Sequence, residues 1–292
     1  MAARVSAAAI ALSACALWLG GQVERASAER VLELSLHGPR RVRLPGGYFD
    51  LGSDGPDVDY AVGLCRAATG GSAACRPELF SDETPRHRVY LRAFAIDRTE
   101  VSHADYARCV ADQACEVPRT AAGDPRMGLP EHPVSGVTWH DAQRYCAWAG
   151  GALPTEAQWE RAASGGGPRR FPWGRHYNSR VANAGRADGE PELLDGYRFA
   201  APVGALPDGR SATGLLQMAG NVWELTADHY APDAYAERDL VDPRGPERGE
   251  TRVMRGGSFR SPPHTLRVTH REQIRPDEAR PDVGFRCAYN VP

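Results

Sequence analysis

The chain has 292 residues, 42% of them hydrophobic, and its 31 glycines and 23 prolines exceed the average combined usage of about 12%, which favours one packed, loop-rich domain over a disordered chain. The formal net charge is only −2 without blocks of like charge, which argues against nucleic-acid binding and against a polybasic membrane contact. All 35 basic residues are arginine, which excludes a lysine Schiff base and a P-loop lysine.

The N-terminus resembles an export signal over residues 1–28. Arg4 supplies the positive charge, Val5 to Leu19 the apolar segment, and Ala26 to Ala28 an A-x-A cleavage site. A lipoprotein signal over residues 1–14, with Cys15 as the lipid-modified N-terminus, is the alternative that the pattern leaves open. No later segment reaches the roughly 18 apolar residues of a membrane span. We therefore expect an exported protein, periplasmic or secreted, or lipid-anchored through Cys15.

Strands are predicted near the start of the domain. Residues 41–51 alternate in polarity and turn at Gly46 and Gly47, which predicts an opening strand and hairpin. Residues 54–83 are predicted to form a long loop tied by a disulfide. Residues 87–96 are a second strand candidate.

Three helices are predicted where Ser or Thr stands three residues before an acidic or amide side chain, the pattern of an N-cap. The first follows Ser102, the second lies between Thr138 and Gly150, and the third covers Glu156 to Ala163. From Pro168 to Asp242 turn-forming residues dominate without a sustained period. A stretch of this length needs another organiser in a compact domain, and bound ions are one.

Cysteine usage also indicates an exported protein. Apart from Cys15, the chain contains Cys65, Cys75, Cys109, Cys115, Cys146 and Cys287. This even number predicts three disulfides, and six cysteines can pair in 15 different ways. Spacing favours local pairs between Cys65 and Cys75 and between Cys109 and Cys115, which leaves Cys146 to pair with Cys287. The absence of a CxxC motif argues against a zinc ribbon or a thioredoxin-like site.

A series of short motifs runs through the chain in a fixed order. They are Pro45–Phe49, Gly52–Ser53, Thr99–Val101, His132–Val134, Tyr145–Cys146, Leu153–Glu160, Pro172–Gly174, Gly220–Glu224, Arg255–Phe259 and Gly284–Cys287. Together they resemble the signature of the formylglycine-generating enzyme, or sulfatase-modifying factor, family. The resemblance implies an irregular, loop-rich α+β fold over residues 41–292, related to C-type lectins. It also implies calcium binding and a disulfide at the positions of Cys146 and Cys287.

The resemblance assigns two calcium sites. The first would use the side chains of Asn183 and Asp195 with the carbonyls of Ala184 and Tyr197. The second would use the side chains of Gln217 and Glu224 with the carbonyls of Gly220 and Val222. Ligation by oxygen alone suits Ca²⁺. The alternatives are turn formation by Asn183 and Asp195 and simple hydrogen bonding by Glu224.

The resemblance also locates the reactive centre, where this chain departs from the family. Active members hold Cu(I) through two cysteines placed three and eight residues after the serine of the Gly-Gly-Ser motif, because thiolates suit this soft ion. Counting from Ser258 gives Ser261 and Leu266. Neither side chain is a soft ligand, so copper-dependent formylglycine formation is not expected.

Several polar and aromatic residues remain as candidates to line the equivalent groove. They are Trp223, Ser258, Ser261, His264, Arg267, His270, Arg271 and Asp282. Two histidines with an acid can bind Fe²⁺ or Cu²⁺, but His264 and His270 fit no standard ligand spacing and are alternatively hydrogen-bonded residues. Arg267 and Arg271 are expected to pair with carboxylates and tie the C-terminal segment to the domain.

Three functions follow from this reading. The first is a binding or accessory module, a pseudoenzyme whose groove holds a peptide, glycan or envelope partner. The second is a periplasmic oxidase of altered chemistry. The third, least supported by the residues at positions 261 and 266, is formylglycine generation on a sulfatase.

Overall fold

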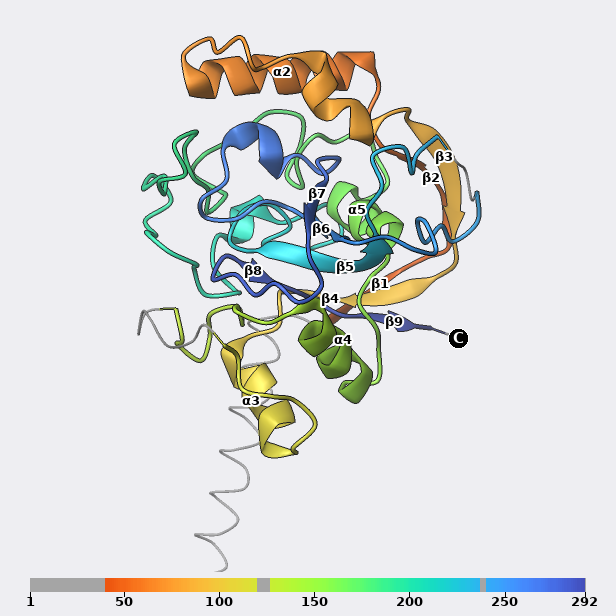
Figure 1. The fold of residues 1–292 in the computed structure, drawn as a ribbon, viewed down its shortest axis with the longest axis vertical. Coiled ribbons are helices and arrows are strands. Elements are labelled where there is room, and N and C mark those ends of the chain that lie inside the picture. The colour runs from red at the N-terminus through yellow and green to blue at the C-terminus, as the bar shows by residue number, and fades with distance from the viewer. Residues whose placement is uncertain (1–39, 120–126, 237–239, 292) are drawn as a thin grey trace, which may run out of the picture. The chain divides into compact units, whose positions relative to one another are not determined.

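The computed structural model describes residues 40–119, 127–236 and 240–291, and the predicted export signal, with Cys15, lies outside them. Residues 41–292 group into one compact unit. Its described residues combine short helices with three small sheets and long irregular connections, so the fold is α+β and loop-rich (Figure 1). No helix among these described residues is both long and apolar enough to cross a bilayer.

The strands form three separate sheets. The first contains β1 (Arg41–Leu44), β4 (Phe94–Asp97) and β9 (Ala288–Asn290), and the second contains β2 (Gly47–Leu51) and β3 (His87–Leu91). The third has the order β7 (Glu272–Ile274), β6 (Arg252–Arg255), β5 (Trp223–His229) and β8 (Val283–Gly284). All strand pairs are antiparallel except β5 with β8. The third sheet lies at the centre of the unit in Figure 1.

The predicted hairpin at Gly46 and Gly47 is wrong, because its two strands join different sheets. In β1, Val42 lies opposite Ile96, whereas β2 pairs with β3. The strand predicted over residues 87–96 is correspondingly broken into β3 and β4. A Cβ on Gly46 would lie 3.1 Å from the backbone nitrogen of Ala93, so this glycine allows the two crossing segments to approach closely.

The loop predicted over residues 54–83 is also wrong, because it contains α2 (Gly55–Thr69) and the 3₁₀ segment η1 (Pro77–Glu83). Asp54 caps α2 by accepting from the backbone nitrogen of Asp57 at 3.2 Å, and Gly70 ends it with φ of 67°. The buried residues of α2 pack against Phe80 in a small apolar cluster of their own. Figure 1 shows α2 at the end of the unit opposite α3 and α4.

The other three helices confirm the capping signals. They are α3 (His103–Ala111), α4 (Trp139–Trp148) and α5 (Glu156–Ser164). Ser102 caps α3, and Thr138 and Thr155 form capping boxes on α4 and α5. In the predicted irregular stretch, residues 168–222 contain only the short η2 (Pro207–Gly209) as a described regular element, but β5 starts at Trp223, which the sequence pattern missed.

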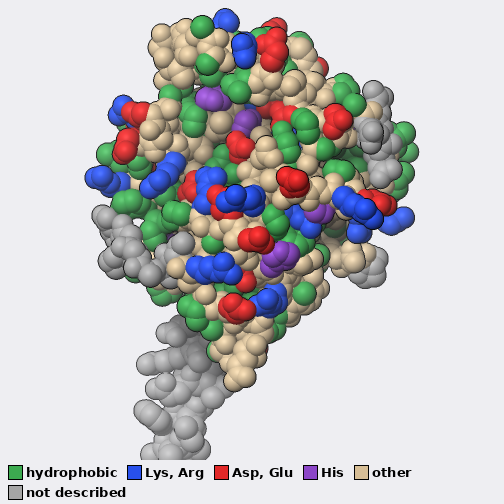
Figure 2. All heavy atoms as spheres, in the orientation of Figure 1, with side chains coloured by type: hydrophobic (Ala, Val, Ile, Leu, Met, Phe, Trp, Pro, Cys, Tyr) green, Lys and Arg blue, Asp and Glu red, His purple; other side chains and the backbone are tan. Residues whose placement is uncertain are grey.

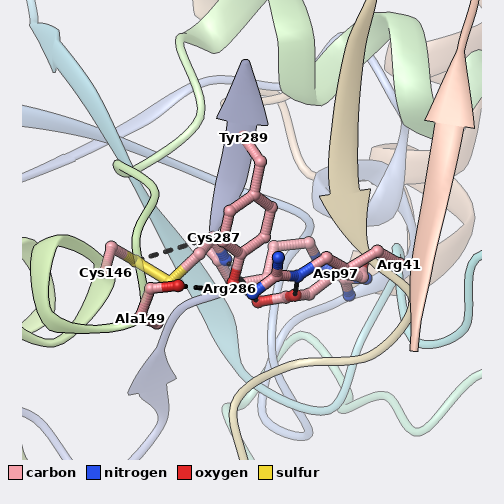
Figure 3. The surroundings of a disulfide bond; sticks show 7 residues. All are labelled: Arg41, Asp97, Cys146, Ala149, Arg286, Cys287 and Tyr289. Carbon is pink, nitrogen blue, oxygen red and sulfur yellow. Dashed lines mark hydrogen bonds and ion pairs between the residues drawn. A yellow bond between two sulfur atoms is a disulfide. The ribbon is translucent and has the colours of Figure 1, made fainter. Parts of the chain in front are cut away.

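The structure confirms all three predicted disulfides, Cys65–Cys75, Cys109–Cys115 and Cys146–Cys287. Figure 3 shows the disulfide Cys146–Cys287, which links α4 to the residue immediately before β9. Beside it, the Asp97 carboxylate accepts from the backbone nitrogen of Cys287 at 3.1 Å, and burial raises the pKa of Asp97 to about 6. The bridge therefore joins elements that lie 141 residues apart.

Charged side chains on the outside carry both signs. On the face drawn in Figure 2, arginine and acidic side chains lie interspersed over the described surface, as the near-zero net charge predicts. Four arginines of the described residues are instead buried inside the protein. Arg255, Arg267 and Arg286 are among the largest fully buried side chains, and each pairs with a buried glutamate.

Candidate functional site

The candidate groove is built on the segment that follows β6. Gly256 and Gly257 adopt φ of 91° and 76°, which other residues rarely adopt, and they turn the chain sharply. A Cβ on Gly257 would lie 3.2 Å from the Cβ of Ser261 and 3.3 Å from Cγ of Leu266. The glycine pair therefore lets residues 258–266 fold back against the turn, ending in the 3₁₀ segment η3 (Pro263–Leu266).

Three of the predicted groove residues meet in one buried hydrogen-bonded group. Oγ of Ser261 accepts from the backbone nitrogen of Ser258 at 2.8 Å and lies 3.2 Å from Oγ of Ser258. The Ser258 hydroxyl donates to Asp282 at 3.1 Å, and Arg280 pairs with Asp282 at 2.8 Å. Ser261 thus stabilises the turn, and among the described residues no imidazole hydrogen-bonds to it to activate it as a nucleophile.

Leu266, at the second position of the cysteine pair, is part of the core. Its side chain is fully buried and packs in an apolar cluster with Phe171, Ala184 and Ala219. All six cysteines of the described residues are in disulfides. The residues present therefore do not fit a bis-thiolate copper centre.

A glutamate that the sequence analysis did not single out organises the segment beyond Leu266. Glu83, at the end of η1, is fully buried, and Arg267 donates to its two oxygens at 2.7 and 2.5 Å. The hydroxyls of Ser53 and Thr269, each at 2.9 Å, and Nδ1 of His270 at 3.2 Å complete its partners. Burial alone would raise the pKa of Glu83, but the charge of Arg267 and the hydrogen bonds from His270 and Arg267 hold it well below its usual range.

The two histidines of the candidate groove keep nitrogens without partners. Nε2 of His270 and Nδ1 of His264 are buried and have no hydrogen-bond partner among the described residues. The His270 ring lies 6.0 Å from the ring of Trp223. Burial lowers the pKa of His264 to about 4, and the positive charges of His270 and Arg267 contribute, so His264 is neutral at pH 7. Each histidine therefore keeps one nitrogen that could form a hydrogen bond with a ligand.

The arginines behave as the sequence predicted. Arg267 pairs with Glu83, and Arg271 donates to both oxygens of Glu156 at 2.7 and 3.0 Å. Both side chains are buried and tie the C-terminal segment to η1 and α5. Neither guanidinium is therefore available to bind a ligand. Within residues 40–119, 127–236 and 240–291, no three His, Cys, Asp or Glu side chains gather in an arrangement that would hold a metal ion.

The first predicted calcium site offers oxygens that fit such an ion. Oδ1 of Asn183 and Oδ2 of Asp195 are buried and lack any hydrogen-bond partner in the described part of the chain. The Asn183 amide nitrogen donates to the carbonyl of Phe199 at 2.8 Å, which orients the side chain. Burial raises the pKa of Asp195 to about 6. A hard cation would satisfy both unpaired oxygens.

The second predicted calcium site is different, because an arginine already neutralises its carboxylate. Arg286 donates to both oxygens of Glu224 at 2.6 Å, and Nε1 of Trp159 donates to one of them at 2.8 Å. Gln217 donates its amide to the carbonyl of Ala205 at 2.9 Å. With the positive charge supplied by Arg286, these side chains do not fit a second calcium ion.

Sequence reasoning had no signal for Glu83. This residue lies 184 positions before Arg267, and no motif or periodicity links the two. An acidic partner was expected for the arginine, but only the fold identifies it.

Comparison with known proteins agrees with the ordered motifs. Residues 29–291 match the sulfatase-modifying factor enzyme 1-like domain. The chain is 35% identical to the formylglycine-generating enzyme of Streptomyces coelicolor, covering 86% of this chain and 89% of the relative. It is 32% identical to a Bos taurus protein named inactive C-alpha-formylglycine-generating enzyme 2, covering 85% and 87%. Among solved structures, PvdO from Pseudomonas aeruginosa superposes with a TM-score of 0.64 at 27% identity, over 86% of this chain and 94% of that one. The chain therefore belongs to the sulfatase-modifying factor enzyme 1-like family.

Proposed function

We propose that this protein is an exported, copper-independent member of the family whose groove binds a peptide, glycan or envelope partner without generating formylglycine. The observation that carries the proposal is the state of the two positions that hold copper in active members. Ser261 is a hydrogen-bonded part of a turn, and Leu266 is buried core. Because the side chains at both positions contribute to the turn and to the core, neither position supplies a ligand for copper.

The groove residues support binding better than redox chemistry. The unpartnered nitrogens of His264 and His270 can exchange hydrogen bonds with an uncharged polar group, and the buried ring of Trp223 lies 6.0 Å from the ring of His270. Peptide amides and sugar hydroxyls are such groups. The relative named as inactive indicates that the family includes proteins to which that activity is not attributed.

Calcium binding at the first site is part of the proposal. The unpaired oxygens of Asn183 and Asp195, with the carbonyls of Ala184 and Tyr197, would hold the ion. The bound ion would order the irregular stretch that contains these residues, and its role there is structural. The disulfides are compatible with export, because oxidising compartments preserve them.

An oxidase of altered chemistry is the second candidate. The observation in its favour is the pair of His270 and Glu83, in which Nδ1 of the imidazole lies 3.2 Å from the carboxylate while Nε2 has no partner in the described chain. An imidazole oriented in this way can act as a general base. Formylglycine generation on a sulfatase is the function to test first, because the chain is 35% identical to a formylglycine-generating enzyme.

The decisive experiment measures oxygen consumption by the purified protein with Cu(I) and a cysteine-containing peptide of the sulfatase type. A peptide with serine in place of cysteine is the control, and mass spectrometry of the peptide detects formylglycine. We expect no turnover above the serine control and no Cu(I) retained against a chelator competitor. Copper-dependent formylglycine formation would overturn the proposal. Oxygen consumption that persists in a copper chelator would instead favour the second candidate.

A further inference from the structure

A cavity of about 280 Å³ is lined by none of the groove candidates, although one of them, Arg271, packs against the lining residue Tyr235. It opens between the start of α5, the end of β5 and the residues that follow β5. Its polar lining includes Glu156, Asp228 and His87, and its apolar walls include Leu51, Pro243 and the ring of Tyr235. A cavity of this size is at the lower end of the range for ligand pockets and suits a group as large as an amino-acid side chain.

Asp228 is the unusual group in this cavity, because it is a buried carboxylate without an ion-pair partner. It is only 3% exposed, and one oxygen accepts from the backbone nitrogen of Glu156 at 2.7 Å, at the first turn of α5. Among the described residues, no cationic nitrogen lies within 4.0 Å of it. Arg271, Arg244 and Arg252 act on it only from a longer distance. Isolated buried carboxylates are costly unless something compensates their charge.

Asp228, Glu156 and Glu160 are three neighbouring carboxylates, and two arginines form the ion pairs of this group. Glu156 pairs with Arg271 at 2.7 Å and with Arg255 at 3.3 Å, and Arg255 also pairs with Glu160. Two guanidinium groups thus pair with these two glutamates, and Asp228 is left with only the more distant charges of arginines that do not pair with it. Burial and the charge of Glu156 accordingly raise the pKa of Asp228 to about 7.

Tyr235 supplies a second polar group to the lining of the cavity. Its side chain is 4% exposed and lines the cavity, and its hydroxyl interacts with the carboxylate of Glu156 and helps to lower the pKa of that group. The Arg271 guanidinium lies 4.5 Å from the centre of its ring. The hydroxyl could accept a hydrogen bond from a ligand that reaches Asp228.

We infer that this cavity binds an organic cation, a primary ammonium or a guanidinium group on a short alkyl chain. The N–H groups of the cation would satisfy the carboxylate of Asp228 and the hydroxyl of Tyr235, while the alkyl chain would lie against Leu51 and the prolines of the wall. Charge-assisted hydrogen bonds of this kind are the strong ones in a desolvated site. The inference is independent of whether the groove is catalytic.

The test is calorimetric or NMR titration of the full chain with n-butylamine and n-butylguanidine at neutral pH, with n-butanol as the neutral comparison. We expect saturable binding of at least one cation and none of the alcohol. The variant Asp228→Asn keeps an oxygen that can accept from the Glu156 nitrogen, and it should weaken cation binding about tenfold or more. The matched control Asp97→Asn changes another buried carboxylate that accepts from a backbone nitrogen, and it should bind as the wild type does.

The variant Tyr235→Phe keeps the wall and removes only the hydroxyl, so it tests the site even if Asp228→Asn fails to fold. We expect it to weaken binding several-fold. The inference is overturned if the wild type binds neither cation, if the alcohol binds as well as the cations do, or if Asp228→Asn folds and binds with unchanged affinity. An unchanged affinity of Tyr235→Phe would likewise count against it. None of these outcomes depends on the oxygen-consumption assay.

Discussion

Replacing Arg267 with methionine should destabilise this protein severely. The arginine side chain is 1% exposed and donates to both oxygens of the fully buried Glu83 at 2.7 and 2.5 Å. Methionine keeps apolar volume against Phe80, whose ring centre lies 4.9 Å from the guanidinium carbon. The substitution therefore mainly removes the positive charge and leaves a buried carboxylate. Breaking a buried ion pair in this way costs about 3–5 kcal/mol.

The pH dependence gives this prediction a second readout. In the wild type the pKa of Glu83 is held below the ordinary value of 4.5, so the pair stabilises the fold above that pH and its contribution is lost as pH falls through the lowered pKa. In Arg267→Met burial is no longer opposed by the arginine, and the pKa of Glu83 rises. Protonation then relieves the penalty, so the difference between variant and wild type should shrink on acidification.

Urea unfolding at pH 7 and near pH 4.5, with the disulfides intact, measures both effects. The control is Arg108→Met, which removes an arginine that is 57% exposed and pairs with Asp105 within α3. Exposed pairs contribute little, so this variant should change the free energy of unfolding by about 0.5 kcal/mol or less. A loss below about 1 kcal/mol for Arg267→Met at pH 7, or a loss that grows on acidification, would refute the assigned role of the Glu83 pair.

Three further predictions test other parts of the structure. Leu266→Ala should lower the free energy of unfolding by about 2–5 kcal/mol in urea titrations, because it leaves a cavity in the core, and a loss near zero would show that this position is not packed. The melting temperature of the wild type should be about 5–10 °C lower in a calcium chelator than in calcium at about a hundred times its Kd. The variant Asp195→Asn should lose most of that shift, and an equal shift in both proteins would exclude the first site. His264 should titrate near pH 4 by NMR. Because its pKa is lower in the folded state than the usual 6.5, the wild type should lose stability as pH falls from about 6.5 to about 4, and His264→Gln should lose less across that window.

Local signals accounted for the parts of the fold that depend on neighbouring residues. Ser102, Thr138 and Thr155 cap their helices because each cap needs only a side chain three positions away. Helix α2 has similar signals in Asp54 at its N-cap and Gly70 at its C-cap, although a disulfide-tied loop was predicted for this region. The caps were therefore better guides than composition.

Pairing over long distances could not be predicted in the same way. Residues 41–51 could pair with each other as a hairpin or pair with residues 87–97 in two sheets, and the alternating pattern is compatible with both arrangements. Glu83 and Asp228 likewise owe their properties to residues far along the chain. Nothing in the neighbouring sequence marks either carboxylate. Glu83 is buried in contact with an arginine and Asp228 is buried without such a contact, and this difference separates the two groups.

The segment from Ser258 to Arg271 explains why the altered reactive centre and the stability of the fold are connected. Ser261 holds the turn, Leu266 fills the core, and Arg267 and Arg271 neutralise buried glutamates. Ser261→Cys would replace the hydroxyl that accepts from the Ser258 nitrogen, and Leu266→Cys would leave part of an apolar cavity empty. Recovering a thiolate pair by substitution would therefore weaken the packing that now surrounds both positions. The proposed binding role fits this coupling, because recovering the thiolate pair takes two substitutions and each of them disturbs a packed position.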